Sequence, residues 1–150
     1  MKTRSFLVLL FIFSCSFVNA QSQLGIGVGS RGVVVKSSPT QKFRYSLRFE
    51  PNGDFYFAYN ADLDVGLNLI REEKAIFYLN FGGGVNTYDT NSQDAEYYFL
   101  KLPVGVEYFP FERKNISVAI EAFPSINFSW YRFEVQNVIF DGLVEIAYYF

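Results

Sequence analysis

Apolar and polar side chains alternate with a two-residue period along most of this 150-residue chain, and this feature constrains the fold more than any other. Successive side chains of a β-strand point to opposite faces, so the period indicates strands whose two faces meet different surroundings. Beyond residue 20, no apolar run reaches the roughly 18 residues that a transmembrane helix needs. The apolar stripes run over residues 43–49, 59–69, 100–108, 116–122 and 144–150.

The length and number of these segments predict a closed barrel. Several runs are nine to twelve residues long, whereas strands of soluble proteins average about five or six and a tilted membrane strand needs roughly 9–11. An even strand number places both ends of the chain on one side. We therefore predict an all-β fold, an eight-stranded antiparallel up-and-down transmembrane β-barrel. Its strands are expected near residues 23–29, 32–37, 42–50, 57–70, 75–87, 97–109, 115–124 and 143–150.

The connections between the strands are predicted from turn residues. Short polar turns are expected at residues 38–41, 71–74 and 110–115, and Pro51–Asp54 is typical of a tight turn. Two longer loops are predicted at residues 88–96 and 125–142, and these loops are candidates for contacts with partners. The first hairpin turns at Ser30–Gly32, and its strands are short for a full membrane crossing.

The first twenty residues have the three parts of a secretory signal peptide. Lys2 and Arg4 form a positive start, Phe6–Phe13 is apolar, and small residues end at Ala20, after which cleavage is expected. This division leaves a signal peptide at 1–20 and one barrel domain at 21–150. An uncleaved anchor is the alternative, although the apolar run is too short to cross a bilayer as a helix. A lipoprotein site at Cys15 is a second alternative, disfavoured by the bulky residue at position 13.

Composition restricts the chemistry. Removing Lys2 and Arg4 from the 13 basic residues leaves 11 against 15 acidic ones, a net charge of −4, so nucleic-acid binding is not expected. The chain has no histidine, and its one cysteine lies in the predicted signal peptide. Histidine-activated nucleophiles and histidine-ligated metals are thereby excluded. We predict no enzymatic activity, no cofactor and no metal site.

Polar residues on the opposite face of the stripes include both signs of charge. If the apolar stripes face lipid, this charged face lines the lumen, which in an eight-stranded barrel is only wide enough for side chains to fill. Buried charges must be paired, so we predict a lumen filled by ion pairs rather than a pore or an acid–base pair at Asp62 and Asp64. The predicted lumen residues are Arg44, Arg48, Glu50, Asp62, Asp64, Lys101, Glu107, Glu121 and Glu145.

Aromatic residues form 20% of the chain, which is typical of the aromatic belts at membrane interfaces. One belt, or alternatively an exposed recognition surface, is expected around the longest loop. The other belt is expected at the opposite interface. The first group is Phe128, Trp130, Tyr131 and Phe133, and the second is Phe109, Phe111, Tyr149 and Phe150.

Several segments resemble those of known outer-membrane barrels. Glu145–Phe150 resembles a C-terminal strand in which Tyr148 and Phe150 form the signal read by the barrel-assembly machinery. Lys101–Pro110, Asn115–Ala122 and the glycine-rich Phe81–Val85 are similar to segments of small porin-like barrels of Bacteroidetes-type bacteria. The glycines there favour bulges, curvature or close packing over a phosphate loop.

This resemblance covers most of residues 24–150 and implies an eight-stranded barrel of the OmpX or OmpA type. It implies no specific activity. We expect a monomer in the bacterial outer membrane, in contact with lipid and with the assembly machinery. The function expected is therefore an integral barrel with a filled lumen and a structural or surface-interaction role. Alternation also fits an inverted arrangement, a soluble exported barrel of the lipocalin type that binds a hydrophobic ligand. A narrow solute channel is the third hypothesis.

Overall fold

The computed structural model describes residues 24–51, 59–90, 93–129 and 134–150, and all of its regular structure is β. All strand pairings in it are antiparallel. The described part of the chain contains no helix of the length and hydropathy needed to span a bilayer. The strands are β1 (Leu24–Gly29), β2 (Gly32–Ser37), β3 (Phe43–Pro51), β4 (Tyr59–Arg71), β5 (Ala75–Thr90), β6 (Gln93–Lys101), β7 (Val104–Tyr108), β8 (Ile116–Ser129) and β9 (Glu134–Tyr149).

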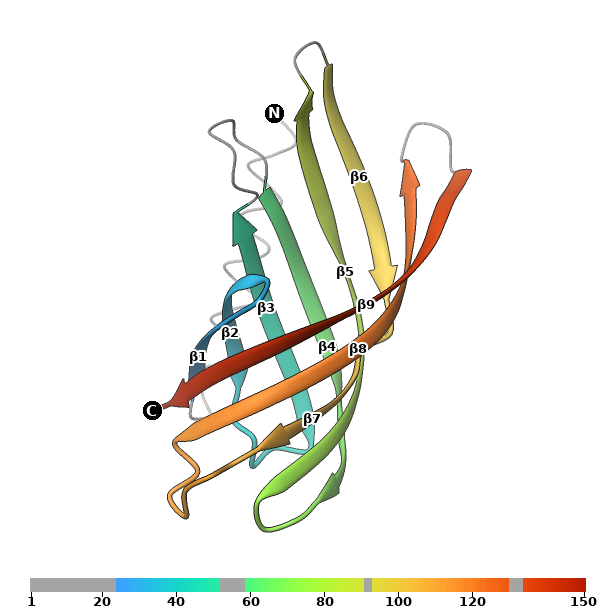
Figure 1. Cartoon of the computed structure of the whole chain (residues 1–150). Coiled ribbons are helices and arrows are strands. Elements are labelled where there is room, and N and C mark those ends of the chain that lie inside the picture. Colours follow the sequence, from blue (N-terminus) through green and yellow to red (C-terminus); the bar gives the residue numbers. More distant parts are fainter. Residues whose placement is uncertain (1–23, 52–58, 91–92, 130–133) are drawn as a thin grey trace.

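The sheet closes on itself as an eight-stranded barrel, which confirms the predicted strand number (Figure 1). Closure is made by β1 and β9, in which Gly25 lies opposite Tyr149. The strands β6 and β7 both pair with β5 and with β8, so together they form one strand of the wall. Pro103 interrupts this strand because proline has no N–H to donate. Its carbonyl oxygen still accepts a hydrogen bond from the Asn80 N–H, at 2.8 Å.

The predicted short turns lie at one end of the barrel, which we call the turn end (Figure 1). β2 and β3 are joined there by residues 38–42, β4 and β5 by 72–74, and β7 and β8 by 109–115. Lys114 takes a positive φ of 51°, and its N–H donates to the Phe111 carbonyl oxygen. β9 also ends at the turn end, whereas the β5–β6 and β8–β9 hairpins extend toward the opposite end, which we call the far end.

The two predicted long loops are wrong. β5 and β6 stay paired until Thr90 lies opposite Gln93, and β8 and β9 stay paired until Ser129 lies opposite Glu134. Polar residues suggested loops, but a strand needs a partner backbone more than it needs apolar side chains, and each of these hairpins supplies its own partner. Of the tight turn predicted at Pro51–Asp54, only Pro51, the last residue of β3, falls within the described residues.

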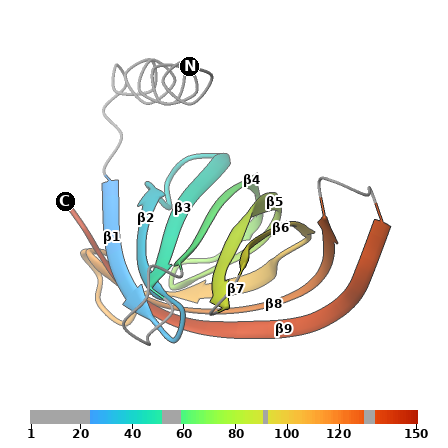
Figure 2. The ribbon, with the colours of Figure 1, turned by 90° about the horizontal axis from the view of Figure 1, so that it is seen from above.

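The barrel wall differs in height around its circumference. β1 and β2 have 6 residues each, and β5 and β9 have 16 each. At about 3.3 Å per residue the longer strands reach more than twice as far. Glu145 on β9 lies opposite Gly29, the last residue of β1. The residues of β9 that precede Glu145 therefore extend beyond β1. Seen from above, this part of β9 and its neighbour β8 curve away from β1 (Figure 2).

Apolar side chains lie on the outer surface of this barrel and polar side chains lie inside it. Leu63 and Ile120 are 47% and 62% exposed, and Val104 and Ile146 fall between these values. The charged residues Arg48, Asp64 and Glu121, which have the opposite parity on their strands, are all less than 5% exposed. For these seven residues the two-residue alternation thus predicted correctly which of them share a face.

Inward-facing glycines make room for bulky side chains on the neighbouring strand. Gly105 lies directly opposite Tyr78, and a Cβ atom on this glycine would overlap the tyrosine ring. Gly25 lies opposite Tyr149, and a Cβ atom there would come 2.6 Å from Cε1 of that ring. Gly82 lies opposite Asp64, and a Cβ atom on this glycine would overlap the Asp64 carboxylate. The interior is therefore filled by pairing large residues with small ones across the ladder.

Candidate functional site

The charged residues inside the barrel are brought together by strand register. Because inward residues on paired strands lie opposite each other, a row of polar side chains runs around the wall. One row begins with Lys36 on β2 and passes through Ser46 on β3, Asp64 on β4 and Gly82 on β5. It continues through Lys101 on β6, which lies opposite Gly82, to Ser125 on β8. Sequence-distant residues thus meet across the lumen.

Glu107 is the centre of the cluster nearer the turn end. Its carboxylate forms ion pairs with Lys36 at 2.7 Å and with Arg44 at 2.8 Å. It also accepts hydrogen bonds from the hydroxyls of Ser117 at 2.5 Å and Tyr149 at 2.7 Å. Glu107 is fully buried, so these four partners replace the hydration that the carboxylate loses on folding.

Arg48 is the centre of a second cluster. Its guanidinium lies 3.3 Å from Asp62, 3.7 Å from Asp64, 3.5 Å from Glu121 and 3.4 Å from Glu145. A fork of several N–H groups suits arginine to this bridging position. The arginine therefore links carboxylates from β4, β8 and β9.

Further contacts join the two clusters. Lys36 pairs with Glu107 of the first cluster and also with Glu145, which belongs to the second cluster. Lys101 lies 2.8 Å from Asp62 and 3.1 Å from Asp64. These contacts make one continuous set, which we call the interior network: Lys36, Arg44, Arg48, Lys101, Asp62, Asp64, Glu107, Glu121 and Glu145.

Aromatic side chains complete the interior network. The Tyr78 hydroxyl donates to Glu121 at 2.8 Å, and the Arg44 guanidinium lies 3.5 Å from the centroid of the Tyr78 ring. Such stacking suits the planar guanidinium, which is weakly hydrated. The arrangement leaves buried charges in contact with opposite charges or with rings.

Most residues predicted for the lumen lie in the interior network, and one does not. Glu50 is half-buried nearer the far end, where it accepts a hydrogen bond from the Asn60 amide at 3.0 Å. The prediction omitted Lys36, which follows three consecutive valines that hide the alternation. It also omitted Tyr78, although the exposed Phe77 and Leu79 on either side of it indicate an inward side chain.

The predicted aromatic belt at the turn end is wrong for two of its four members. Phe109 and Tyr149 are 1% and 3% exposed, and their rings pack inside the barrel with centroids 6.1 Å apart. Phe111 and Phe150 point outward as expected. The reason is parity, because Tyr149 follows the outward Tyr148 and must therefore face inward.

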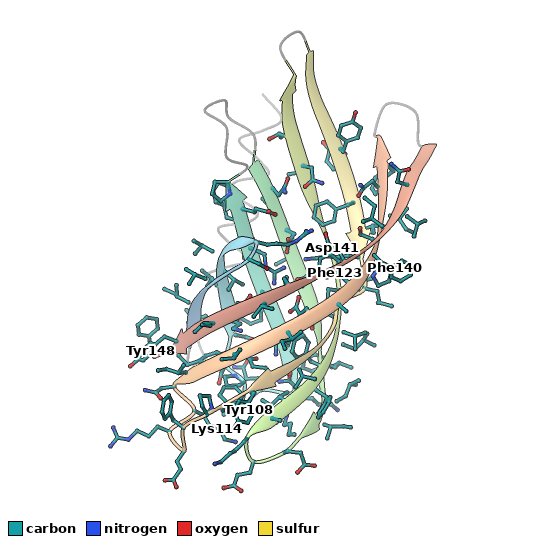
Figure 3. The ribbon with its side chains drawn as sticks, in the orientation of Figure 1. Tyr108, Lys114, Phe123, Phe140, Asp141 and Tyr148 are labelled. Atoms are coloured by element: carbon teal, nitrogen blue, oxygen red, sulfur yellow. The ribbon has the colours of Figure 1, made fainter. Side chains whose placement is uncertain are left out.

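The remaining predicted aromatic residues fall into two groups. Tyr148 and Phe150, the predicted assembly signal, are exposed and pack edge to face with ring centroids 5.2 Å apart. Figure 3 shows Tyr148 projecting from the outer surface of β9. Phe128 stacks on Tyr98, whereas Trp130, Tyr131 and Phe133 lie outside the described residues.

A hollow lies on either side of the interior network. The one at the turn end has a volume of about 220 Å³ and is bordered by Thr40, Arg71 and Lys114. The one toward the far end, which we call the vestibule, has a volume of about 280 Å³. Asp141 on β9 and Phe123 on β8, which lie opposite each other, border the vestibule (Figure 3). Its other polar lining includes Arg31, Glu50, Asn60, Asn86, Ser125 and Asn127.

Comparison with known proteins gives no match to this chain. No family model, no curated protein and no solved structure is significantly similar to it. Within the described ranges, no three acidic side chains are grouped in a way that would hold a metal ion. The resemblance to small outer-membrane barrels stays a prediction from sequence.

Proposed function

We propose that this chain is an integral β-barrel of the bacterial outer membrane, exported by residues 1–20 and held rigid by its interior network. The observation that carries the proposal is the inverted placement of side chains, with apolar residues outside and paired charges inside. On this proposal lipid and the barrel-assembly machinery are its partners, and the barrel acts as a structural or surface-exposed anchor without catalysis.

The outer surface supports this proposal on energetic grounds. Exposed apolar side chains such as Leu63, Val65 and Leu67 follow one another along β4, and neighbouring strands continue the surface. Soluble monomers seldom expose contiguous apolar patches of more than a few hundred Å², because each Å² of apolar surface left in water costs about 25 cal/mol. In a bilayer this cost is absent, and a closed ladder satisfies the backbone hydrogen bonds.

Strand length supports the same proposal. β4, β8 and β9 have 13, 14 and 16 residues, which exceeds the roughly 9–11 that a tilted strand needs to cross the hydrocarbon. β1 and β2 are shorter than this length. On the proposal, the bilayer thins beside them.

The two alternative functions have less support. A lipocalin-type barrel needs an apolar interior for its ligand, and the interior positions described here hold the charged network instead. A solute channel needs a continuous aqueous path, whereas the interior network lies between the turn-end hollow and the vestibule. The membrane barrel with a filled lumen therefore agrees best with the arrangement.

The membrane proposal is tested with single cysteines. Cys15 is the only cysteine and lies in the predicted signal peptide, so on the proposal the mature chain has no thiol and a single introduced cysteine allows a fluorophore to be attached at one chosen site. Leu63→Cys and Ile120→Cys test the outer surface, and Glu73→Cys, at an exposed turn, is the matched control. We expect lipids that carry a quencher in their acyl chains to quench the first two labels strongly and the control label weakly.

Two further measurements complete this test. Membrane fractionation is expected to recover the protein only with detergent, and gel migration is expected to change on heating, as is typical of folded membrane barrels. Recovery in a soluble fraction without detergent, together with equal quenching at all three positions, would refute the proposal.

A further inference from the structure

We propose that the vestibule binds a small organic cation, a solute with a primary ammonium group that pairs with Glu50. This inference concerns the far end of the barrel and does not depend on the membrane assignment. It rests on three features of the described residues: a carboxylate without a cationic partner, a row of amides beside it, and a largely buried serine whose hydroxyl has no hydrogen-bond partner among them.

Register builds one wall of the vestibule. Glu50 on β3 lies opposite Asn60 on β4, and Asn60 lies opposite Asn86 on β5. All three line the vestibule, so a carboxylate and two amides stand side by side across three strands. Asn127 and Ser125 on β8 line it as well. A solute in this space meets oxygen acceptors from several strands.

The charges around the vestibule leave one carboxylate uncompensated among the described residues. Asp62 is paired with Arg48 and Lys101 of the interior network. Asp141 is paired with Arg31. Glu50 accepts its hydrogen bond from the neutral Asn60 amide, and no described lysine or arginine forms an ion pair with it. A half-buried carboxylate of this kind attracts a cation.

An independent observation also indicates a ligand. Ser125 is only 8% exposed and lines the vestibule, yet its hydroxyl forms no hydrogen bond with another described residue. The same holds for the amides of Asn86 and Asn127. The Ser125 oxygen is not fully buried and opens into the vestibule, so a polar ligand there can supply the hydrogen bond that the side chain lacks.

The combination favours a cation over other ligand classes. An anion would be repelled by Glu50, and an apolar molecule would leave the Asn86 and Asn127 amides and the Ser125 hydroxyl without partners. A neutral polyol would satisfy the amides and leave the carboxylate without a counter-charge. The volume of about 280 Å³ is close to the lower limit for small-molecule sites, roughly 300 Å³, so the solute must be small.

The proposal is tested by titrating the full folded protein in detergent with 1,4-diaminobutane at low ionic strength. We expect saturable binding that weakens at least about ten-fold in Glu50→Gln, because a charge-assisted hydrogen bond is lost. Glu73→Gln, which removes the same charge from an exposed turn at the other end, is expected to bind like the unaltered protein. Asn86→Asp, which adds a carboxylate beside the row, is expected to bind more tightly.

Glycerol and glutarate serve as neutral and anionic probes of similar size, and neither is expected to bind. Far-UV circular dichroism of every variant shows that each remains folded. Absence of saturable diamine binding, equal binding by Glu50→Gln and Glu73→Gln, or a preference for glycerol would each overturn the proposal. These outcomes leave the quenching and fractionation results unaffected, so failure here and failure of the membrane proposal are distinguishable.

Discussion

Each buried charge of the interior network depends on specific partners, and Glu107 illustrates this at the scale of single residues. Its carboxylate is shared by Lys36, Arg44 and two hydroxyls. We expect Glu107→Ala to lower the free energy of unfolding by about 3–5 kcal/mol, because it leaves buried cations without a counter-charge. Urea unfolding of the refolded barrel measures the loss.

The control for this substitution is Glu112→Ala, at an exposed turn position, which is expected to change stability by no more than about 0.5 kcal/mol. Equal effects of Glu107→Ala and Glu112→Ala would mean that the interior network contributes little to stability.

The close packing of Gly105 against Tyr78 on the paired strand gives a second prediction at the scale of single residues. A Cβ atom on Gly105 overlaps the ring of Tyr78, which is held by Glu121 and Arg44. We expect Gly105→Ala to destabilise the barrel by about 1–3 kcal/mol through overpacking. In a Tyr78→Ala background the same change is expected to cost much less. The coupling is measured by a double-mutant cycle, and additive effects would argue against the contact.

Individual side chains were predicted from sequence wherever alternation was unbroken. Arg48, Asp64 and Glu121 face inward as expected, because each is flanked by apolar residues of opposite parity. Alternation does not identify Lys36, which follows a run of valines, and aromatic type alone places Tyr149 in the outer belt although its parity is inward. Parity is the better guide, since it follows directly from strand geometry.

At the scale of elements, the short β1–β2 hairpin is attached to the barrel mainly by its ladders. Its turn residue Arg31 pairs with Asp141 on β9, but both side chains are about one-third exposed. Solvent screens such pairs, so we expect Arg31→Ala to cost no more than about 1 kcal/mol. Arg48→Ala, which breaks a buried cluster, is expected to cost about 3–5 kcal/mol. Similar urea midpoints for the two variants would contradict this ranking.

Strand ends were the least predictable features of the elements. Polar composition predicted a loop over residues 125–142, yet β8 and β9 run through most of this range as a paired hairpin. Turn residues predicted the β4–β5 turn at 72–74 correctly, because a short charged run there separates two apolar strands. A strand end depends on whether a neighbouring backbone is still present, and local composition carries little information about that.

For the whole molecule, the filled interior predicts that the barrel conducts no ions across a membrane. The interior network occupies the lumen between the two hollows, and its charges are held by ion pairs. We expect the protein, reconstituted into a planar bilayer, to show no discrete conductance steps under an applied voltage. A known porin in the same bilayer is the positive control. Reproducible conductance steps from the purified chain would instead favour the solute channel.

The sequence by itself determined the strand period and, where the alternation is unbroken, which residues share a face. Those properties are local, because every second side chain of a strand points the same way whatever the strand pairs with. Only the tertiary structure decided which inward residues meet, how far each hairpin extends and where the vestibule forms. Lys36 and Glu145 pair across 109 positions of sequence because barrel closure brings β9 beside β1, and closure belongs to the whole chain.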